Sequence, residues 1–454
     1  RAAFADVLRV HDYPYVRGLQ ARCGALTQDE RTSIDGDTVV SRRSFDAAMC
    51  AAGVVCEAVD RVCSGKARNA FCAIRPPGHH AGLRGVVESG DDAHGSSGFC
   101  LLNNVAIGAA YAKHMWRGTV QKVAIVDFDV HHGNGTEDVV RNLVPHEESF
   151  PVQNPLCSAV LKTHTFKPWL DEQDAANVLF VSTHGYGKKQ GPASEGGGNW
   201  FYPSSGSTEV FGTQDVEVAA PATQPQVLNV GLGLGEPGAT RNGRLELRNA
   251  YRDTILPKLA EFSPDLILIS AGFDAHKKDT MACGFVGLID DDYAWLTHQL
   301  VLIANRCCQG RIVSMLEGGY NIQGGPVSVF ARSVATHVEA LAEGSQARNT
   351  WKAEDAAWES QYENALAAER ERKRAEKAEK ARAQVEAALA DKLKQDDERA
   401  AAKKRSHAEE GADHPDSGAT AAAATEQAPK RSRRGTGSVD YVALAAKLEK
   451  ESQA

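Results

Sequence analysis

Four short apolar segments, each followed by chemically active side chains, constrain this chain more than any other feature of its sequence. They cover residues 71–74, 123–131, 265–270 and 311–316, and glycine follows each one closely. Short apolar segments of this kind are typical of buried strands, and in open parallel sheets functional sites form beyond the carboxyl ends of the strands. We therefore predict an α/β domain with one site. The side chains expected to meet there are His79, His80, Asp127, Asp129, His131, Asp274 and Tyr320.

The segment at 123–134 is the most informative of the four. Read as a strand, it places Asp127, Asp129 and His131 on one face and Phe128 and Val130 on the other. Two carboxylates and an imidazole are costly to bury together, but they suit a divalent cation. Each residue alone also fits a turn, a helix cap or a core histidine. Because four segments end in the same way, we favour a metal-dependent hydrolase.

Five motifs then carry a resemblance to a known family. They are RPPGHHA at 75–81, GFCLLNN at 98–104, DFDVHHGNGT at 127–136, SAGFD at 270–274 and LEGGYN at 316–321. Together they resemble the zinc-dependent histone deacetylases, most closely class II, over roughly residues 1–341. The resemblance implies the arginase/deacetylase fold, whose central and mostly parallel sheet has helices on both faces.

The pattern of apolar residues places the other elements. Helices are predicted at 44–64, 103–115, 245–261, 291–307 and 328–342, and further strands at 178–183 and 227–230. Two polar loops, at 141–177 and 185–199, are longer than is usual in the family and are expected near the site mouth. Long loops without their own structure either shape substrate entry or are tolerated insertions, and both interpretations stay open.

The resemblance implies that Asp129, His131 and Asp274 are the three protein ligands of one catalytic Zn²⁺. Three ligands leave a coordination position for water and the substrate carbonyl. Iron also suits two carboxylates and an imidazole. A structural K⁺ is implied beside the zinc. Its expected ligands are Asp127, Asp129, His131, Ser182 and Thr183.

The catalytic roles also follow from the resemblance. His80 is the expected general base, and Asn134, where class I enzymes carry Asp, holds it. His79 acts electrostatically and is oriented by Asp127. Tyr320 donates a hydrogen bond to the developing oxyanion, and its presence predicts real activity, because a weak class II subgroup has His there.

An apolar channel should receive the acyl-lysine side chain, since its end is neutral. Phe99 matches one wall and Tyr202 the opposite wall, which is usually Phe; Gly98 and Gly319 complete the channel. Met281 matches a rim position that is Glu in the polyamine-preferring branch. An apolar residue there disfavours a cationic polyamine, although Met281 also fits ordinary core packing.

Three regions are predicted along the chain. Residues 1–343 form the catalytic domain, which we expect to be N-terminally truncated because residues 8–15 resemble a segment inside the family's domain. Residues 344–405 form a charged helical extension, solvated or paired with a partner. Residues 406–454 form a disordered basic tail. Basic clusters at 403–405 and 430–434 fit nuclear import signals, weak phosphate-binding patches or a solvated tail.

Composition excludes several classes of protein. The net charge of −8 provides no general nucleic-acid-binding surface, and no run of eighteen apolar residues or secretory leader is present. The ten cysteines are scattered and fit a reducing compartment. We expect the nucleus, with the cytoplasm as the alternative.

The predicted activity is zinc-dependent hydrolysis of N-acetyl-lysine on proteins, with histone tails as default substrates and corepressor proteins as partners. Three alternatives stay open: an acetylpolyamine or small-amide deacetylase, a catalytically weak acetyl-lysine-binding corepressor scaffold, and an arginase-like dimanganese hydrolase. The last needs further Asp and His ligands that the motifs lack.

Overall fold

A computed structural model describes residues 1–89, 92–154, 157–189, 200–207, 225–234, 243–324 and 326–344, with scattered residues between 361 and 401. The chain divides into two compact units, Arg1–Ala367 and Ala368–Ala454.

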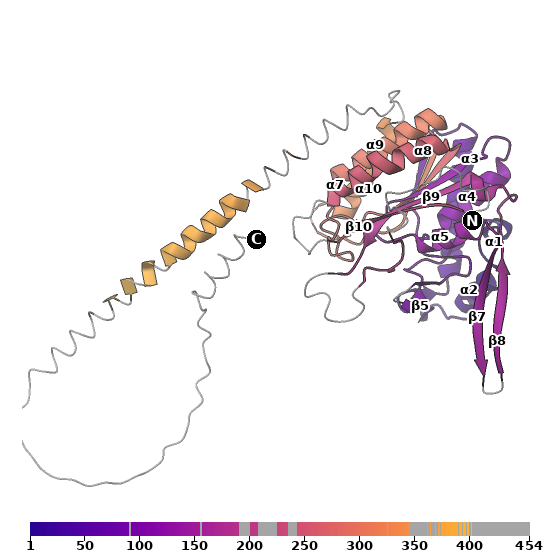
Figure 1. The fold of residues 1–454 in the computed structure, drawn as a ribbon, viewed down its shortest axis with the longest axis horizontal. Helices are drawn as coiled ribbons and strands as arrows, with labels where there is room; N and C mark the ends of the chain where they lie inside the picture. Colours follow the sequence, from indigo (N-terminus) through magenta and orange to yellow (C-terminus); the bar gives the residue numbers. More distant parts are fainter. Residues whose placement is uncertain are drawn as a thin grey trace, which may run out of the picture. The chain divides into compact units, whose positions relative to one another are not determined.

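A six-stranded parallel sheet forms the centre of the first unit (Figure 1). Its strand order is β10-β9-β6-β11-β12-β3, and every neighbouring pair is parallel. The strands are β3 (Asn69–Cys72), β6 (Val123–Asp127), β9 (Val178–Tyr186), β10 (Gln226–Gly233), β11 (Leu266–Ala271) and β12 (Ile312–Leu316). The predicted α/β class is confirmed.

Helices cover both faces of this sheet. The helices of this unit's described residues are α1 (Phe4–Leu8), α2 (Tyr13–Gly24), α3 (Ser44–Cys63), α4 (Asn104–Met115), α5 (Asn134–Arg141), α6 (Asp174–Asn177), α7 (Gly243–Ala250), η3 (Tyr251–Ile255), α8 (Leu256–Phe262), α9 (Asp290–Cys307) and α10 (Val329–Gly344). Successive strand residues point to opposite faces. Val123 and Ile125 therefore join the core with α3 and α4, while Ala124 and Val126 join the core with α8, α9 and α10.

The strand predicted through residues 123–131 ends earlier than expected, at Asp127. The carboxylate of Asp127 accepts a hydrogen bond from the backbone N–H of Asp129, and Asp129 does the same for His131. Such turns divert the backbone from the sheet. The prediction that Asp129 and His131 belong to the strand was therefore wrong, although both still follow its carboxyl end.

The helix predicted at 245–261 is interrupted. It consists of α7, a π-helical turn η3 and α8, and Pro257 stands in the first turn of α8. A proline has no N–H for an intrahelical hydrogen bond, so it is tolerated where a helix begins. The other four predicted helices agree with α3, α4, α9 and α10 to within two residues.

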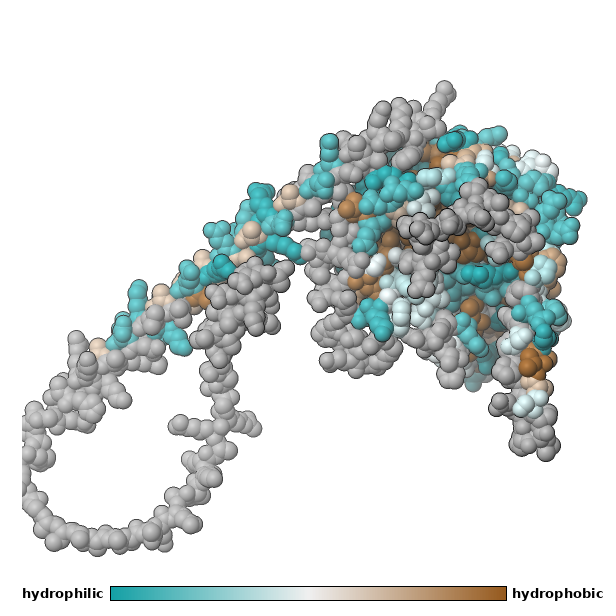
Figure 2. Space-filling view, in the orientation of Figure 1, coloured by the Kyte–Doolittle hydropathy of each residue, from teal (hydrophilic) through white to brown (hydrophobic). Residues whose placement is uncertain are grey.

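The stretch at 141–177 is not a loop without structure of its own. It contains an antiparallel hairpin, β7 (His146–Asn154) with β8 (Cys157–Thr165), and then α6. The hairpin follows α5 and leads back to β9, and its residues Ser149 and Thr165 line a pocket together with Val87 and Glu88. Its expected position near the site mouth stays a prediction. Val160 and Leu161 of β8 are 63% and 54% exposed, and Figure 2 shows hydrophobic surface on this hairpin.

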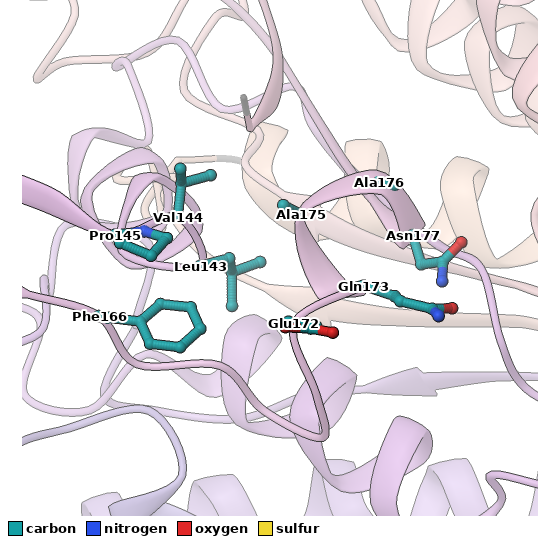
Figure 3. Close-up of a pocket in the computed structure, with 9 residues that line it drawn as sticks. All are labelled: Leu143, Val144, Pro145, Phe166, Glu172, Gln173, Ala175, Ala176 and Asn177. Atoms are coloured by element: carbon teal, nitrogen blue, oxygen red, sulfur yellow. The ribbon is translucent and has the colours of Figure 1, made fainter. Parts of the chain in front are cut away.

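A pocket of about 840 Å³ lies at the base of the hairpin (Figure 3). Phe166 and the segment after α5 form one side, and α6 forms the other. The lining residues are Leu143, Val144, Pro145, Phe166, Glu172, Gln173, Ala175, Ala176 and Asn177. No predicted site residue lines this pocket, so it is separate from the predicted active site.

Two further small sheets are antiparallel pairs, β1 (Arg31–Ser33) with β2 (Val39–Ser41) and β4 (Val87–Ser89) with β5 (Asp92–Ser96). In the second unit, residues 374–388 are helical. Arg372 Nη1 lies 3.6 Å from Oε1 of Glu376, which is one helical turn further along the chain. The predicted tail at 406–454 and most of the loop at 185–199 lie outside the described residues. Across the described parts of the chain, no helix combines the length and apolar character needed to cross a bilayer.

Candidate active site

Asp129, His131 and Asp274 come together beyond the carboxyl ends of β6 and β11. The Nδ1 atom of His131 lies 3.1 Å from Asp129 Oδ1 and 3.1 Å from Asp274 Oδ2, and all three residues are buried. Ligand atoms around a tetrahedral zinc, each about 2.0–2.1 Å from the ion, are about 3.3 Å apart. Among the described residues, this trio is the group of His, Cys, Asp and Glu side chains that fits a metal ion.

The surroundings of the trio also fit a cation. Asp274 Oδ2 is buried without a well-directed hydrogen-bond donor among the described residues. A Cβ atom on Gly272 would lie 2.0 Å from Asp129 Oδ2, and one on Gly318 would lie 2.3 Å from Asp274 Oδ2, so only glycine lets the backbone approach so closely. Burial and repulsion by Asp129 raise the pKa of Asp274 to about 6. A bound cation would offset the free-energy cost of burying these carboxylates in their charged form.

His80 is held in one tautomer by Asn134. The Nδ1 atom of His80 lies 2.7 Å from Asn134 Oδ1, which also accepts a hydrogen bond from the backbone N–H of Gly135. Because this oxygen only accepts, His80 Nδ1 carries the proton, and Nε2 keeps a free lone pair. Burial and the charges of His79 and His131 lower the pKa of His80 well below its usual range. A neutral imidazole of this kind is suited to accept a proton.

His79 has the opposite electrostatic environment. Its ring lies 4.0 Å from that of His80, and its Nδ1 atom is 2.9 Å from Asp127 Oδ2. Burial opposes protonation of His79, but the charges of Asp127 and Asp129 outweigh it and raise its pKa to about 10. The surroundings therefore favour the charged form of His79 and the neutral form of His80.

Tyr320 stands beside the predicted channel wall. Its ring centroid is 5.9 Å from that of Phe99, in an edge-to-face arrangement. Gly319 has a φ of +137°, and a Cβ atom there would lie 2.3 Å from the ring of Phe330. Glycine at this position therefore allows the sharp approach that brings Tyr320 to the site.

Two other predicted channel residues, Tyr202 and Gly98, lie beside His80. The ring of Tyr202 is 5.1 Å from that of His80, and its hydroxyl oxygen accepts a hydrogen bond from Ser96 Oγ at 2.9 Å. A Cβ atom on Gly98 would lie 2.3 Å from the His80 ring. Phe99 has a φ of +68° and donates its N–H to Thr38 Oγ1. Met281 is 50% exposed, so the alternative that it packs in the core was wrong.

The predicted K⁺ ligands come from two neighbouring strands and the loop after β6. Asp127 and Ser182 are register partners in β6 and β9, and Thr183 Oγ1 donates to the carbonyl oxygen of Asp127 at 3.3 Å. The K⁺ site itself stays a prediction.

Two buried carboxylates near the site were not assigned any role from the sequence. Glu317 Oε2 accepts hydrogen bonds from the backbone N–H groups of Gly78 and His79, at 2.7 and 3.2 Å. Asp279 accepts four backbone N–H groups from two loops. The position of Glu317 directly after a buried strand could have indicated a site residue. Asp279 lies in a polar loop, where an aspartate is ordinary.

The fold and the buried trio are consistent with a metal-dependent α/β hydrolase, and comparison with known proteins identifies the family. Residues 1–341 match the histone deacetylase domain, so the chain belongs to this family of deacetylases. The family is in general zinc-dependent, and the Asp129–His131–Asp274 trio is consistent with it.

Relatives and a solved structure agree. Type-2 histone deacetylases 2 and 1 of Dictyostelium discoideum are 33% and 36% identical, over 74% and 68% of this chain. The chain spans only 18% and 20% of their lengths. A protein of Archaeoglobus fulgidus named "Probable deacetylase" is 31% identical over 71% of this chain and 68% of its own. The crystal structure of the HDA15 HD domain matches with a TM-score of 0.53 and 25% identity, covering 76% of each chain.

Proposed function

We propose that this protein hydrolyses N-acetyl-lysine on proteins, with histone tails as the first substrate to test. The observation that carries the proposal is the placement of His80, with a fixed tautomer and a free Nε2, beside three buried side chains that fit a zinc ion. The family indicates the class of reaction, and the arrangement of these side chains supports the role proposed for each.

Asp129, His131 and Asp274 would hold the zinc ion. When bound, the ion supplies Lewis-acid activation of water and of the substrate carbonyl. His80 Nε2 takes the proton of the attacking water and later delivers a proton to the departing lysine amine. His79, charged and fixed by Asp127, stabilises negative charge beside it. Tyr320 donates a hydrogen bond to the carbonyl oxygen as charge develops there.

The channel residues account for the substrate class. Phe99 and Tyr202 present aromatic surface to the apolar stem of an acylated lysine, and the exposed Met281 at the rim offers no charge to a polyamine. We also propose that residues 1–343 form the catalytic region and that it binds a K⁺ at Asp127, Asp129, His131, Ser182 and Thr183. We further propose that the basic clusters direct the protein to the nucleus and that corepressor proteins are its partners.

The test is turnover of a fluorogenic acetyl-lysine peptide by the zinc-loaded protein, compared with acetyl-spermidine. Tyr320→Phe should lower kcat roughly 100-fold or more without loss of zinc, because one oxyanion donor is removed. Asp129→Asn should lose both zinc and turnover. If the zinc-loaded parent does not hydrolyse the peptide, the proposal is contradicted. Turnover of acetyl-spermidine would then favour a small-amide deacetylase. Two bound metal ions per chain would favour an arginase-like enzyme.

A further inference from the structure

Asp279 lies between the loop that follows Asp274 and the loop that carries Tyr320. Its side chain is buried, with 5% of the residue exposed. Oδ1 accepts the backbone N–H groups of Met281 and Ala282 at 2.8 and 3.2 Å, and Oδ2 accepts those of Tyr320 and Asn321 at 2.8 and 3.2 Å. One carboxylate therefore joins both loops, and these four hydrogen bonds are called the Asp279 clamp below.

Only a carboxylate matches this set of four donors. An ionised Asp has two oxygens with about four lone-pair sites and no donor. An amide of the same shape would place an NH₂ group opposite two backbone N–H groups and leave them without an acceptor. Buried N–H groups without partners are costly. Of the side chains that fit this space, Asp alone satisfies both loops.

The loop of Tyr320 is held at both ends. After Tyr320, Asn321 Nδ2 also donates to the carbonyl oxygen of Lys278, the residue before Asp279, at 2.5 Å. Before Tyr320, Gly318 donates its N–H to Asp129 Oδ2 at 2.8 Å. The backbone around Tyr320 is thus fixed between a predicted metal ligand and Asp279. A phenol that donates a hydrogen bond to a developing oxyanion must be held in position, because a displacement of about 1 Å can lower the rate about 100-fold.

We infer that Asp279 is a positioning residue for the deacetylation reaction, acting through the backbone of Tyr320. The inference rests on the proposed function, since it assigns Tyr320 to the oxyanion. Asp279 also holds the backbone N–H of Met281, the residue predicted at the channel rim.

The experiment is a double-variant cycle with Asp279→Asn and Tyr320→Phe, measuring kcat, KM and zinc content on an acetyl-lysine peptide. Asp279→Asn should lower kcat roughly 10-fold or more, with zinc retained and KM changed less than about 3-fold. In the Tyr320→Phe background the same change should cost less than about 2-fold. Equal losses in both backgrounds, or zinc loss that parallels the activity loss, would overturn the inference.

A matched control and a second readout keep the test decisive. Asp265 Oδ2 accepts the backbone N–H groups of Gln121 and Lys122 at the other end of β11. Asp265→Asn makes the same chemical change away from the site, but its amide oxygen can still accept both N–H groups, so it should leave kcat unchanged. Amide hydrogen exchange should accelerate in the 317–324 segment of Asp279→Asn and not in Asp265→Asn. Unchanged exchange there would overturn the clamp even if the parent had no deacetylase activity, an outcome that separately contradicts the proposed function. If Asp279→Asn does not fold, Asp279→Glu takes its place in both measurements.

Discussion

Among single residues, Glu317 shows how a side chain behind the site holds the groups that react. It is fully buried, its Oε1 accepts from Ser270 Oγ at 3.2 Å, and its Oε2 accepts the N–H groups of Gly78 and His79. Burial raises the pKa of Glu317 to about 7, although the charge of His79 opposes this. Near neutral pH its negative charge is therefore less important than its acceptor oxygens.

This balance predicts different outcomes for two substitutions. Glu317→Gln keeps the size of the side chain and an oxygen for Gly78 and His79, and its NH₂ group can donate to Ser270, so kcat should stay within about 3-fold. Glu317→Ala leaves two buried N–H groups without a partner and should cost about 1–3 kcal/mol per group in the free energy of unfolding. Denaturant unfolding and peptide turnover at pH 7 measure both. Equal damage from the two variants would show that charge, not hydrogen bonding, is what matters.

Among the elements, α4 and α6 are linked by an ion pair that no solvent reaches. Lys113 Nζ lies 3.1 Å from Asp174 Oδ1, and both side chains are buried. Lys113 also donates to the carbonyl oxygen of Gln121, while Asp174 Oδ2 accepts the N–H groups of Trp169 and Leu170. This pair anchors the segment that returns from the β7–β8 hairpin to the sheet.

Removing one partner should therefore be worse than removing both. Lys113→Met leaves the Asp174 charge buried alone and should lower the free energy of unfolding by about 3–5 kcal/mol. The double variant Lys113→Met with Asp174→Asn should recover part of this loss. Denaturant unfolding of the two single variants and the double variant tests the coupling. Strictly additive losses would mean that the two charges do not compensate each other.

For the whole molecule, the sequence predicted the sheet and the site better than the connections. Strand positions followed from apolar segments, and His79, His80, Asp127, Asp129, His131, Asp274 and Tyr320 do lie around one site because parallel strands end at one edge. The metal-binding, catalytic and cation-binding roles of these residues stay predictions.

The features that were missed depend on contacts distant in sequence or on short-range hydrogen bonds. The β7–β8 hairpin lacks a clean apolar alternation, since neighbouring Val160 and Leu161 are both exposed. The early end of β6 depends on side-chain hydrogen bonds of Asp127 and Asp129 to the following backbone. Two of the four contacts of Asp279 join residues about forty positions apart. None of these features has a periodic pattern that a single sequence would reveal.

Stability against acid should depend on histidines that the fold buries in neutral form. His337 of α10 is fully buried, and burial lowers its pKa to about 3. Thr297 Oγ1 donates to the carbonyl oxygen of Tyr293 and so accepts from His337 Nδ1, while Ser314 Oγ donates to Nε2. Both ring nitrogens of the neutral form are satisfied, and protonation would break the bond to Ser314.

The sign of the pH effect follows from this lowered pKa. Between pH 6.5 and about 3 the unfolded chain binds a proton at His337 that the folded chain does not, so stability falls as the pH falls through this window. His337→Gln should be less stable than the parent at pH 7, and the gap should narrow by up to about 1.4 kcal/mol per pH unit below 6.5. Denaturant unfolding at pH 7, 6, 5 and 4 measures it, with His164→Gln, whose side chain is 78% exposed, as the matched control. A gap that stays constant across this range would mean that His337 is not held neutral in the folded protein.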